Sequence, residues 1–158
     1  MAFDAFLKMD GIAGESADKF HKDEIEISSF SWGVSNTGTG GVGGGGGAGK
    51  ASFQDLHFSS SVSKASPLLA KFCATGEHIK EATLTVRKGG GGDKGFEFMK
   101  IKLNDVLVSS YANGGSVGDD RPSDQFSLNF VKIDFLYTVE RTGETTEFQF
   151  DQRFNTEG

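Results

Sequence analysis

The feature that most limits how this chain can fold is an alternation of apolar and polar residues whose phase changes repeatedly. Residues 24–27 carry isoleucine at odd positions, whereas residues 30–34 carry large apolar side chains at even positions. Alternation with a period of two is typical of strands that bury one face. The phase changes at Ser28–Ser29, and one extra residue in a strand produces such a change, so we predict a bulge or bend there.

Two longer alternating segments show the same interruptions. Residues 96–108 change phase near Met99 and at Asn104–Asp105, and residues 126–139 change phase at Phe130–Val131. Long strands with such interruptions are what a strongly bent sheet or a closed barrel requires. We therefore predict a mainly β fold, a single closed or nearly closed antiparallel β-barrel that spans residues 1–158, with long Gly-rich loops.

One short helix is expected at about residues 66–75. Ser66 can cap its start, and Pro67 suits the first helical turn. An apolar stripe follows at Leu68, Leu69, Phe72 and Cys73. Gly76 can end the helix in the left-handed conformation. A helix this short needs tertiary contacts, so it is expected to lie on the sheet.

The longest Gly-rich stretch, residues 36–50, contains a partial match to a phosphate-binding loop. Residues 44–50 fit the first seven positions of G-x-x-x-x-G-K-[ST], but Ala51 stands where the hydroxyl residue belongs. A strand pattern follows, whereas the phosphate loop must enter a helix. With 23 glycines in the chain, chance matches are common. A flexible surface loop is the favoured interpretation, and nucleotide binding a remote one.

Composition excludes several function classes. The net charge is −6 and the 16 basic residues form no stripe, which argues against nucleic-acid binding. No apolar run has the length of a signal peptide or of a membrane-spanning helix, so neither export by a leader nor membrane insertion is expected. Cys73 is the only cysteine, which excludes an internal disulfide and suits a reducing cytoplasm.

No catalytic or metal-binding constellation is evident. His21, His57 and His78 lack metal-ligand spacing, and His57 is expected to face away from the core. Cys73 lies on the apolar stripe and is expected to be a buried thiol. Asp119–Asp120 suits a turn rather than acid–base chemistry. We therefore expect no enzyme, no cofactor and no metal.

A row of small residues lies opposite the large ones in residues 29–35. Ser29, Ser31 and Gly33 alternate with the bulky apolar side chains, and none of them is charged. An ordinary solvent-facing strand usually carries Lys, Glu or Thr. The row is therefore compatible either with a plain exposed face or with a face that something contacts closely.

An ordered set of short motifs resembles one known family over essentially the whole chain. The motifs are Phe6–Ser16, His21, Glu24–Ile27, Ser29–Gly33, Asp55–Phe58, Lys64–Pro67, Gly76–Ile79, Arg87–Gly90, Val106–Ser110, Gly114–Ser116 and Ser127–Ile133. Together they resemble the Hcp proteins of type VI secretion, although no single motif is decisive. The chain departs from the pattern at Phe150–Asp151, where relatives often carry tryptophan.

The resemblance implies a structural role rather than catalysis. Members fold as a β-barrel with a flanking helix, close into hexameric rings, and stack into a tube inside a contractile sheath. The tube, tipped by a VgrG-type spike, carries effector proteins in its lumen. This implies assembly in the bacterial cytoplasm and secretion without a signal peptide. We expect no C-terminal effector domain, because the chain ends at Gly158.

Two sets of residues follow as candidates. Ser29, Ser31 and Gly33 are predicted to face the lumen and touch effectors. A second set is predicted to contact a neighbouring subunit or ring, namely Thr37, Gly43, Gly45, Gly47 and Lys50. A barrel that binds a small ligand and a phage-type tail tube of another contractile system are the alternatives.

Overall fold

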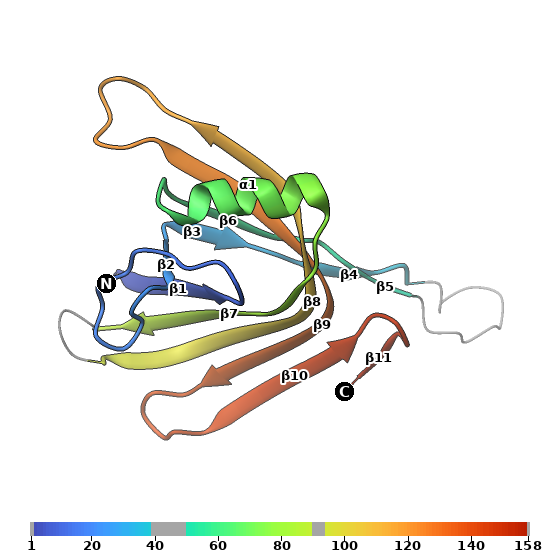
Figure 1. Cartoon of the computed structure of the whole chain (residues 1–158). Coiled ribbons are helices and arrows are strands. Elements are labelled where there is room, and N and C mark those ends of the chain that lie inside the picture. The colour runs from blue at the N-terminus through green and yellow to red at the C-terminus, as the bar shows by residue number, and fades with distance from the viewer. Residues whose placement is uncertain (1, 39–49, 90–93, 158) are drawn as a thin grey trace.

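The computed structural model describes residues 2–38, 50–89 and 94–157, and these form a mainly β fold with one helix (Figure 1). The prediction of a mainly β fold with a single short helix is confirmed. The elements in order are β1 Phe3–Met9, β2 Ile25–Ile27, β3 Ser29–Ser31, β4 Val34–Asn36, β5 Ala51–Phe53, β6 Leu56–Ser61, α1 Ala65–Thr75, β7 Ile79–Lys88, β8 Phe96–Gly114, β9 Ser123–Thr138, β10 Thr145–Asp151 and β11 Thr156–Glu157.

In the described part of the chain, nine strands form one antiparallel sheet, and β4 and β5 form a separate two-stranded ribbon. The main path runs β11-β10-β9-β8-β7-β1-β2, and β6 joins it by pairing with both β9 and β3. Strands β8 and β9 are long, and they pair with each other both in the half of the sheet that contains β7 and β10 and in the half that contains β6. The ribbon extends away from the body of the molecule (Figure 1).

A fully closed barrel is not confirmed, because the sheet is open beside β2. Strands β2 and β3 are separated only by Ser28, whose N–H donates to the Ser59 carbonyl at 2.8 Å. Before that point β2 pairs with β1 and forms no ladder with β6. A hollow of about 280 Å³ remains there, lined by residues of both segments. The bend at Ser28 thus takes the chain from β2, at one end of the main path, to β3, which pairs with β6 outside that path, without closing the ladder.

The predicted interruptions of the long strands are confirmed, and they lie opposite each other. Asn104 pairs with Lys132 and Val106 pairs with Phe130, so the two interruptions fall at one corner. Asp105 has a φ of 55°, which turns β8 sharply at that corner. Near Met99, β7 pairs Val86 with Met99 but Arg87 with Glu97, so Phe98 is an extra residue. These bends let two strands wrap one core.

Aromatic and aliphatic side chains fill the space that the bent sheet encloses. Phe53 contacts Phe130, Phe148 and Phe150, and Trp32 packs edge-on against Phe135. The buried apolar core is continuous from β1 to β9. Side chains therefore fill the interior, as they do in small barrels.

Helix α1 covers the core where predicted but begins differently. Leu69 is completely buried, and Gly76 ends the helix at φ 68° with its N–H donating to the Phe72 carbonyl. Ser66, however, does not cap the helix, because it is buried within the first turn. The hydroxyl of Ser63 instead accepts from the Ala65 N–H, and the Ser66 hydroxyl accepts from the Ser63 N–H. Cys73 is half-buried rather than fully buried.

Candidate functional site

The serines of β3 belong to a larger surface that the sheet assembles from four strands. Ser29 and Ser31 are exposed, while Phe30 between them packs on the core. Residues directly opposite each other in antiparallel strands share a face. The register therefore gives one row of Ser29, Ser59, Gln125 and Ala112, and a second row of Ser31, His57, Ser127 and Ser110.

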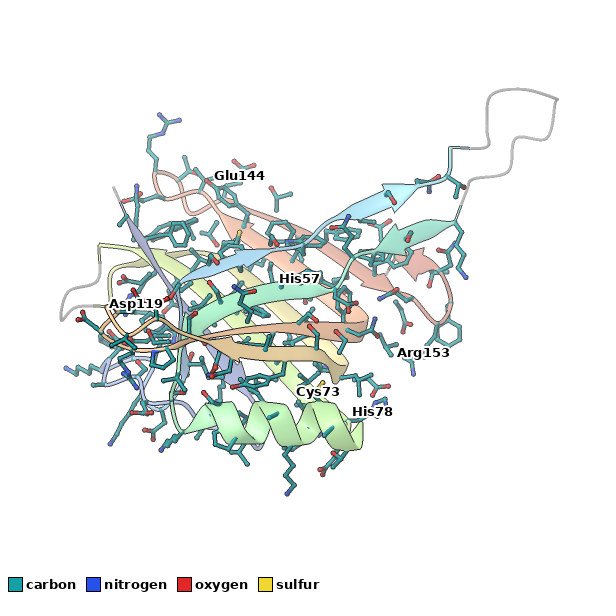
Figure 2. All side chains as sticks on the ribbon, turned by 90° about the horizontal axis from the view of Figure 1, so that it is seen from above. His57, Cys73, His78, Asp119, Glu144 and Arg153 are labelled. Carbon is teal, nitrogen blue, oxygen red and sulfur yellow. The ribbon has the colours of Figure 1, made fainter. Side chains whose placement is uncertain are left out.

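These eight residues, here called the small-residue face, include no Asp, Glu, Lys or Arg. A hollow of about 560 Å³ lies on this face, and His57, one of the residues that line it, is labelled in Figure 2. Its hydroxyls bind one another: Ser29 Oγ lies 2.5 Å from Ser59 Oγ, and Ser110 Oγ lies 2.5 Å from Ser127 Oγ. These four hydroxyls are thus satisfied within the sheet, and none of the eight residues carries a fixed charge. His57 faces away from the core, as predicted.

The predicted lumen residues do not all lie together. Ser29 and Ser31 lie on the small-residue face, but Gly33 follows the end of β3 and is half-buried. The Gly33 carbonyl accepts from the Gln54 N–H at 2.9 Å, and a Cβ at Gly33 would lie 3.4 Å from the Gln54 side chain. Gly33 therefore lies where the chain leaves the sheet for the β4–β5 ribbon.

The second predicted set lies at the end of that ribbon. Thr37 follows β4 and Lys50 precedes β5, and both are exposed. Gly43, Gly45 and Gly47 lie outside the described residues, as does most of the partial phosphate-loop match. Lys50 leads directly into strand β5. A phosphate loop would enter a helix instead, so the local structure does not fit nucleotide binding.

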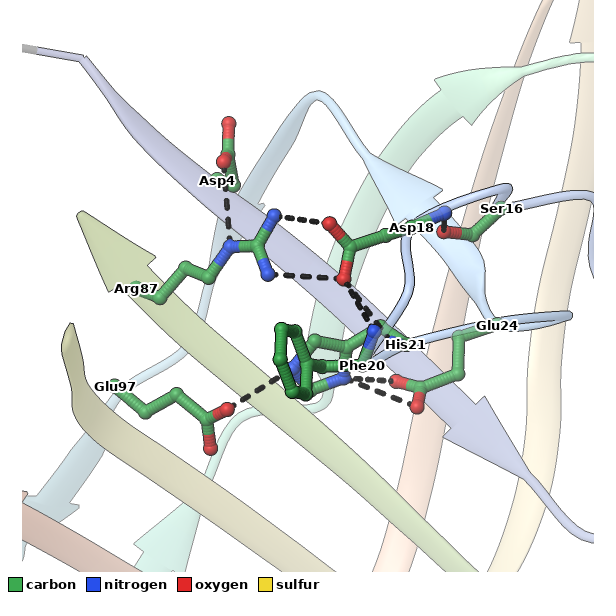
Figure 3. Close-up of polar contacts among 8 residues, drawn as sticks. All are labelled: Asp4, Ser16, Asp18, Phe20, His21, Glu24, Arg87 and Glu97. Carbon is green, nitrogen blue, oxygen red and sulfur yellow. Dashed lines mark hydrogen bonds and ion pairs between the residues drawn. The ribbon is translucent and has the colours of Figure 1, made fainter. Parts of the chain in front are cut away.

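Sequence reasoning missed a polar cluster under the segment that links β1 to β2 (Figure 3). Arg87 of β7 donates to both carboxylate oxygens of Asp18, at 2.9 and 2.5 Å, and its Nε approaches Asp4 at 3.4 Å. The Arg87 side chain is only 3% exposed. This bidentate contact lowers the pKa of Asp18 to about 2.

The imidazole of His21 occupies the other half of this cluster. Its Nδ1 lies 3.0 Å from both oxygens of Glu24, and its Nε2 lies 3.1 Å from Glu97. The ring stacks on Phe6, with centroids 4.6 Å apart and planes 6° apart. The guanidinium of Arg87 also lies over Phe6, 4.8 Å from its centroid. These contacts bind the segment to the outer side of the sheet.

The signal that could have revealed this cluster is Phe6 itself. In the alternation of β1, Phe6 lies on the face that points away from the core, opposite Thr85, yet its side chain is buried. A large aromatic residue at a solvent position of a strand indicates that another segment covers it. Because its charged groups face one another, the cluster is suited to holding the linking segment rather than to binding a ligand.

The described residues also bear on membrane insertion and metal binding. Within residues 2–38, 50–89 and 94–157, no helix is long and apolar enough to cross a membrane. In the same ranges, no group of three or more His, Cys, Asp or Glu residues is placed to hold a metal ion.

Comparisons with known proteins match the chain along most of its length. The family model described as "Type VI secretion system effector, Hcp" matches residues 6–137. Protein hcp1 of Pseudomonas aeruginosa is 43% identical over 141 residues, which cover 89% of this chain and 86% of that protein. The crystal structure of Hcp1 from Salmonella typhimurium has a TM-score of 0.85 at 36% identity, with full coverage of both chains. A type VI secretion system effector from Yersinia pestis has a TM-score of 0.78 at 31% identity, covering 94% of this chain and 99% of the other.

Proposed function

Because this chain belongs to the Hcp family of type VI secretion proteins, we propose that it is the subunit of the secretion system's inner tube. Six copies form a ring, rings stack into a tube, and effector proteins travel in the lumen. The tube lies inside a contractile sheath and carries a VgrG-type spike. The family is one of secretion proteins and not a known enzyme family.

The small-residue face is the observation that carries this proposal. Its uncharged serines lie on one side of β3, β6, β9 and β8, and the Phe-rich core lies on the other. A lumen wall that carries different effectors needs a surface without strong charge or bulky protrusions, because specific pairing would hold one occupant and hinder others. In this proposal the nearly closed barrel presents this face to the lumen.

Each border of the small-residue face is a strand edge whose backbone can pair with a strand of a neighbouring subunit. Among the residues that the structure describes, strand β3 pairs only with β6, and beyond Val106 strand β8 pairs only with β9. Two different edges on opposite borders suit a heterologous contact, which repeats around an axis and closes into a ring. Pairing would also cover edges that are otherwise prone to aggregation.

The two alternatives fit the structure less well. A barrel that binds a small ligand needs an internal cavity, but a continuous cluster of buried side chains, among them Leu103, Phe126 and Leu128, occupies the interior. A tail tube of another contractile system would use the same ring, and the type VI family match favours the secretion role.

Electron microscopy of the purified protein in negative stain tests the proposal. We expect annular particles with an open bore and a native mass of about six chains. A stable monomer over the micromolar concentration range, with no annular particles, would contradict the proposed function.

A second test concerns the lumen assignment of Ser31. Ser31→Trp adds a bulky ring to the small-residue face, so we expect severalfold fewer effector proteins to copurify per ring, with ring yield unchanged. Lys100→Trp, on the exposed side of β8 in the other half of the sheet, is the matched control. Should Ser31→Trp reduce ring yield while the protein retained per ring stays constant, the face does not line the lumen.

A further inference from the structure

The molecule has two chemically different ends along its strands. The turn of residues 115–122, which joins β8 to β9 and includes Asp119, lies at one end (Figures 1 and 2). The corner where β8 and β9 bend lies at the opposite end, near His78 and Arg153 (Figure 2).

At the corner, where Asp105 turns β8 at a φ of 55° while the register with β7 and β9 is kept, lies a pocket of about 320 Å³. It is lined by Lys80, Asn104, Asp105, Val131, Lys132 and Arg153, and is called the corner pocket. Val131 and the lysine stems provide apolar wall, and the three cations face a single lining carboxylate. This is a local positive site on a chain whose net charge is −6.

The cations of the corner pocket are only partly neutralised. Arg153 donates to Asp151 at 2.8 and 3.2 Å, and the Asp105 carboxylate contacts His78 Nδ1 at 2.8 Å. Within the described part of the chain, Lys80 and Lys132 form no salt bridge. Lys132 lies directly opposite Asp151, whose pKa it helps to lower. Both lysine ammonium groups can still contact an external carboxylate, because neither is held in a salt bridge by the described residues.

The turn at the other end carries the complementary groups. Val117 is fully exposed, and Asp119 and Asp120 beside it are exposed as well. The Asp119 N–H donates to the Ser116 carbonyl at 2.9 Å, which fixes the turn. Arg121 is directed away, because its Nη2 donates to the Val62 carbonyl at 2.5 Å. The turn thus presents one aliphatic side chain next to two carboxylates.

We propose that Val117 of one copy enters the corner pocket of a second copy, with Asp119 and Asp120 contacting Lys80 and Lys132. The contact joins opposite ends of two molecules, so it propagates in one direction and orients stacked copies head to tail. Apolar contact inside a ring of opposite charges provides both affinity and register. This inference rests on the proposed tube, since it places the contact between rings.

Cysteine cross-linking tests the contact directly. In a Cys73→Ser background, Val117→Cys and Lys80→Cys are introduced singly and together, and assembled protein is treated with a short bis-maleimide. We expect the double variant to give a covalent ladder of dimers, trimers and longer chains on a denaturing gel. Each single variant should remain monomeric, because the two positions meet only in a heterologous contact.

Two outcomes would overturn the inference while the tube stands. One is dimers from Val117→Cys alone, which would indicate head-to-head contact. The other is no ladder from the double variant although microscopy shows stacked rings. If microscopy shows no rings at all, the proposed function itself fails and the inference falls with it, so the two failures are distinguishable.

Charge reversal provides an independent readout. Asp119→Lys and Lys80→Glu should each lower the stacked fraction about ten-fold, because like charges would meet, and the two together should restore most of it. Glu144→Lys, in another exposed turn on the Asp119 side (Figure 2), makes the same charge change as a control. Equal loss in the control, or no restoration in the double variant, would contradict the contact.

Discussion

Replacing Arg87 by alanine is expected to lower the free energy of unfolding by about 3–5 kcal/mol, because it leaves a poorly solvated carboxylate without its partner. Arg87 is almost completely buried, and it forms two hydrogen bonds to Asp18 and a third to Asp4. Its loss also exposes Phe6, over which the guanidinium lies. Urea unfolding followed by circular dichroism measures the change.

Lys88→Ala is the matched control for this substitution. Lys88 is the next residue of β7 and pairs with Glu140, but both side chains are about half exposed. Exposed pairs contribute about 0–1 kcal/mol, so the control should lose far less stability. Equal losses from the two substitutions would show that burial of the Arg87–Asp18 pair does not matter.

The same pair predicts the acid dependence of stability. The pKa of Asp18 is lowered from 3.8 to about 2, chiefly by the hydrogen bonds from Arg87. A carboxyl with a lowered folded-state pKa stabilises the fold above its unfolded value, so this contribution is complete above about pH 4 and is lost as the pH falls toward 2. We expect Arg87→Ala to flatten the stability profile over this interval. A profile parallel to that of the wild type would contradict this assignment.

Asp124→Ala is expected to cost about 3 kcal/mol, because three donors lose a buried acceptor. The Asp124 carboxylate accepts from the Ser66 hydroxyl of α1, from Tyr111 at 2.8 Å and from Asn113 at 2.9 Å. Asp124 is 1% exposed, so water cannot readily replace it. Burial and the adjacent Asp124 also raise the pKa of Tyr111, which keeps the phenol a donor. Thermal unfolding measures the change.

Two variants separate this network from a general effect of charge removal. Asp124→Asn keeps the size and one acceptor oxygen, so we expect it to lose less than the alanine variant. Asp10→Ala removes an exposed carboxylate and should change stability by no more than about 0.5 kcal/mol. If Asp124→Ala lowers stability no more than Asp10→Ala does, the hydrogen bond between α1 and Asp124 of β9 does not stabilise the fold.

The periodicity of the sequence was informative about bends as well as strands. The phase changes at Ser28–Ser29, Asn104–Asp105 and Phe130–Val131 coincide with bends or breaks in the ladder. This succeeds because side chains of a strand alternate strictly, so a bend or bulge that exchanges the two faces of the strand appears as a change of phase. Helix α1 was located by Pro67 and Gly76, which act through local backbone geometry.

Contacts between distant segments were not accessible in this way. Local spacing predicts Ser66 as a helix cap, but its hydroxyl donates to Asp124, which lies 58 residues away. The ion pair of Arg87 and Asp18 spans 69 residues, and neither residue stands in a motif that indicates the other. Such pairs depend on which strands become neighbours, and the sequence pattern does not specify that.

The sequence by itself determined the strand-rich fold, its bends, the place of the helix and the family, because each is expressed in local spacing or in an ordered set of motifs. Only the tertiary structure decided that Ser29 and Ser31 continue across β6, β9 and β8 as one uncharged face. It also decided that the sheet stays open beside β2, and that a positive pocket forms at the corner. The physical reason is that register and strand order arise from long-range packing, which brings together residues that no local pattern connects.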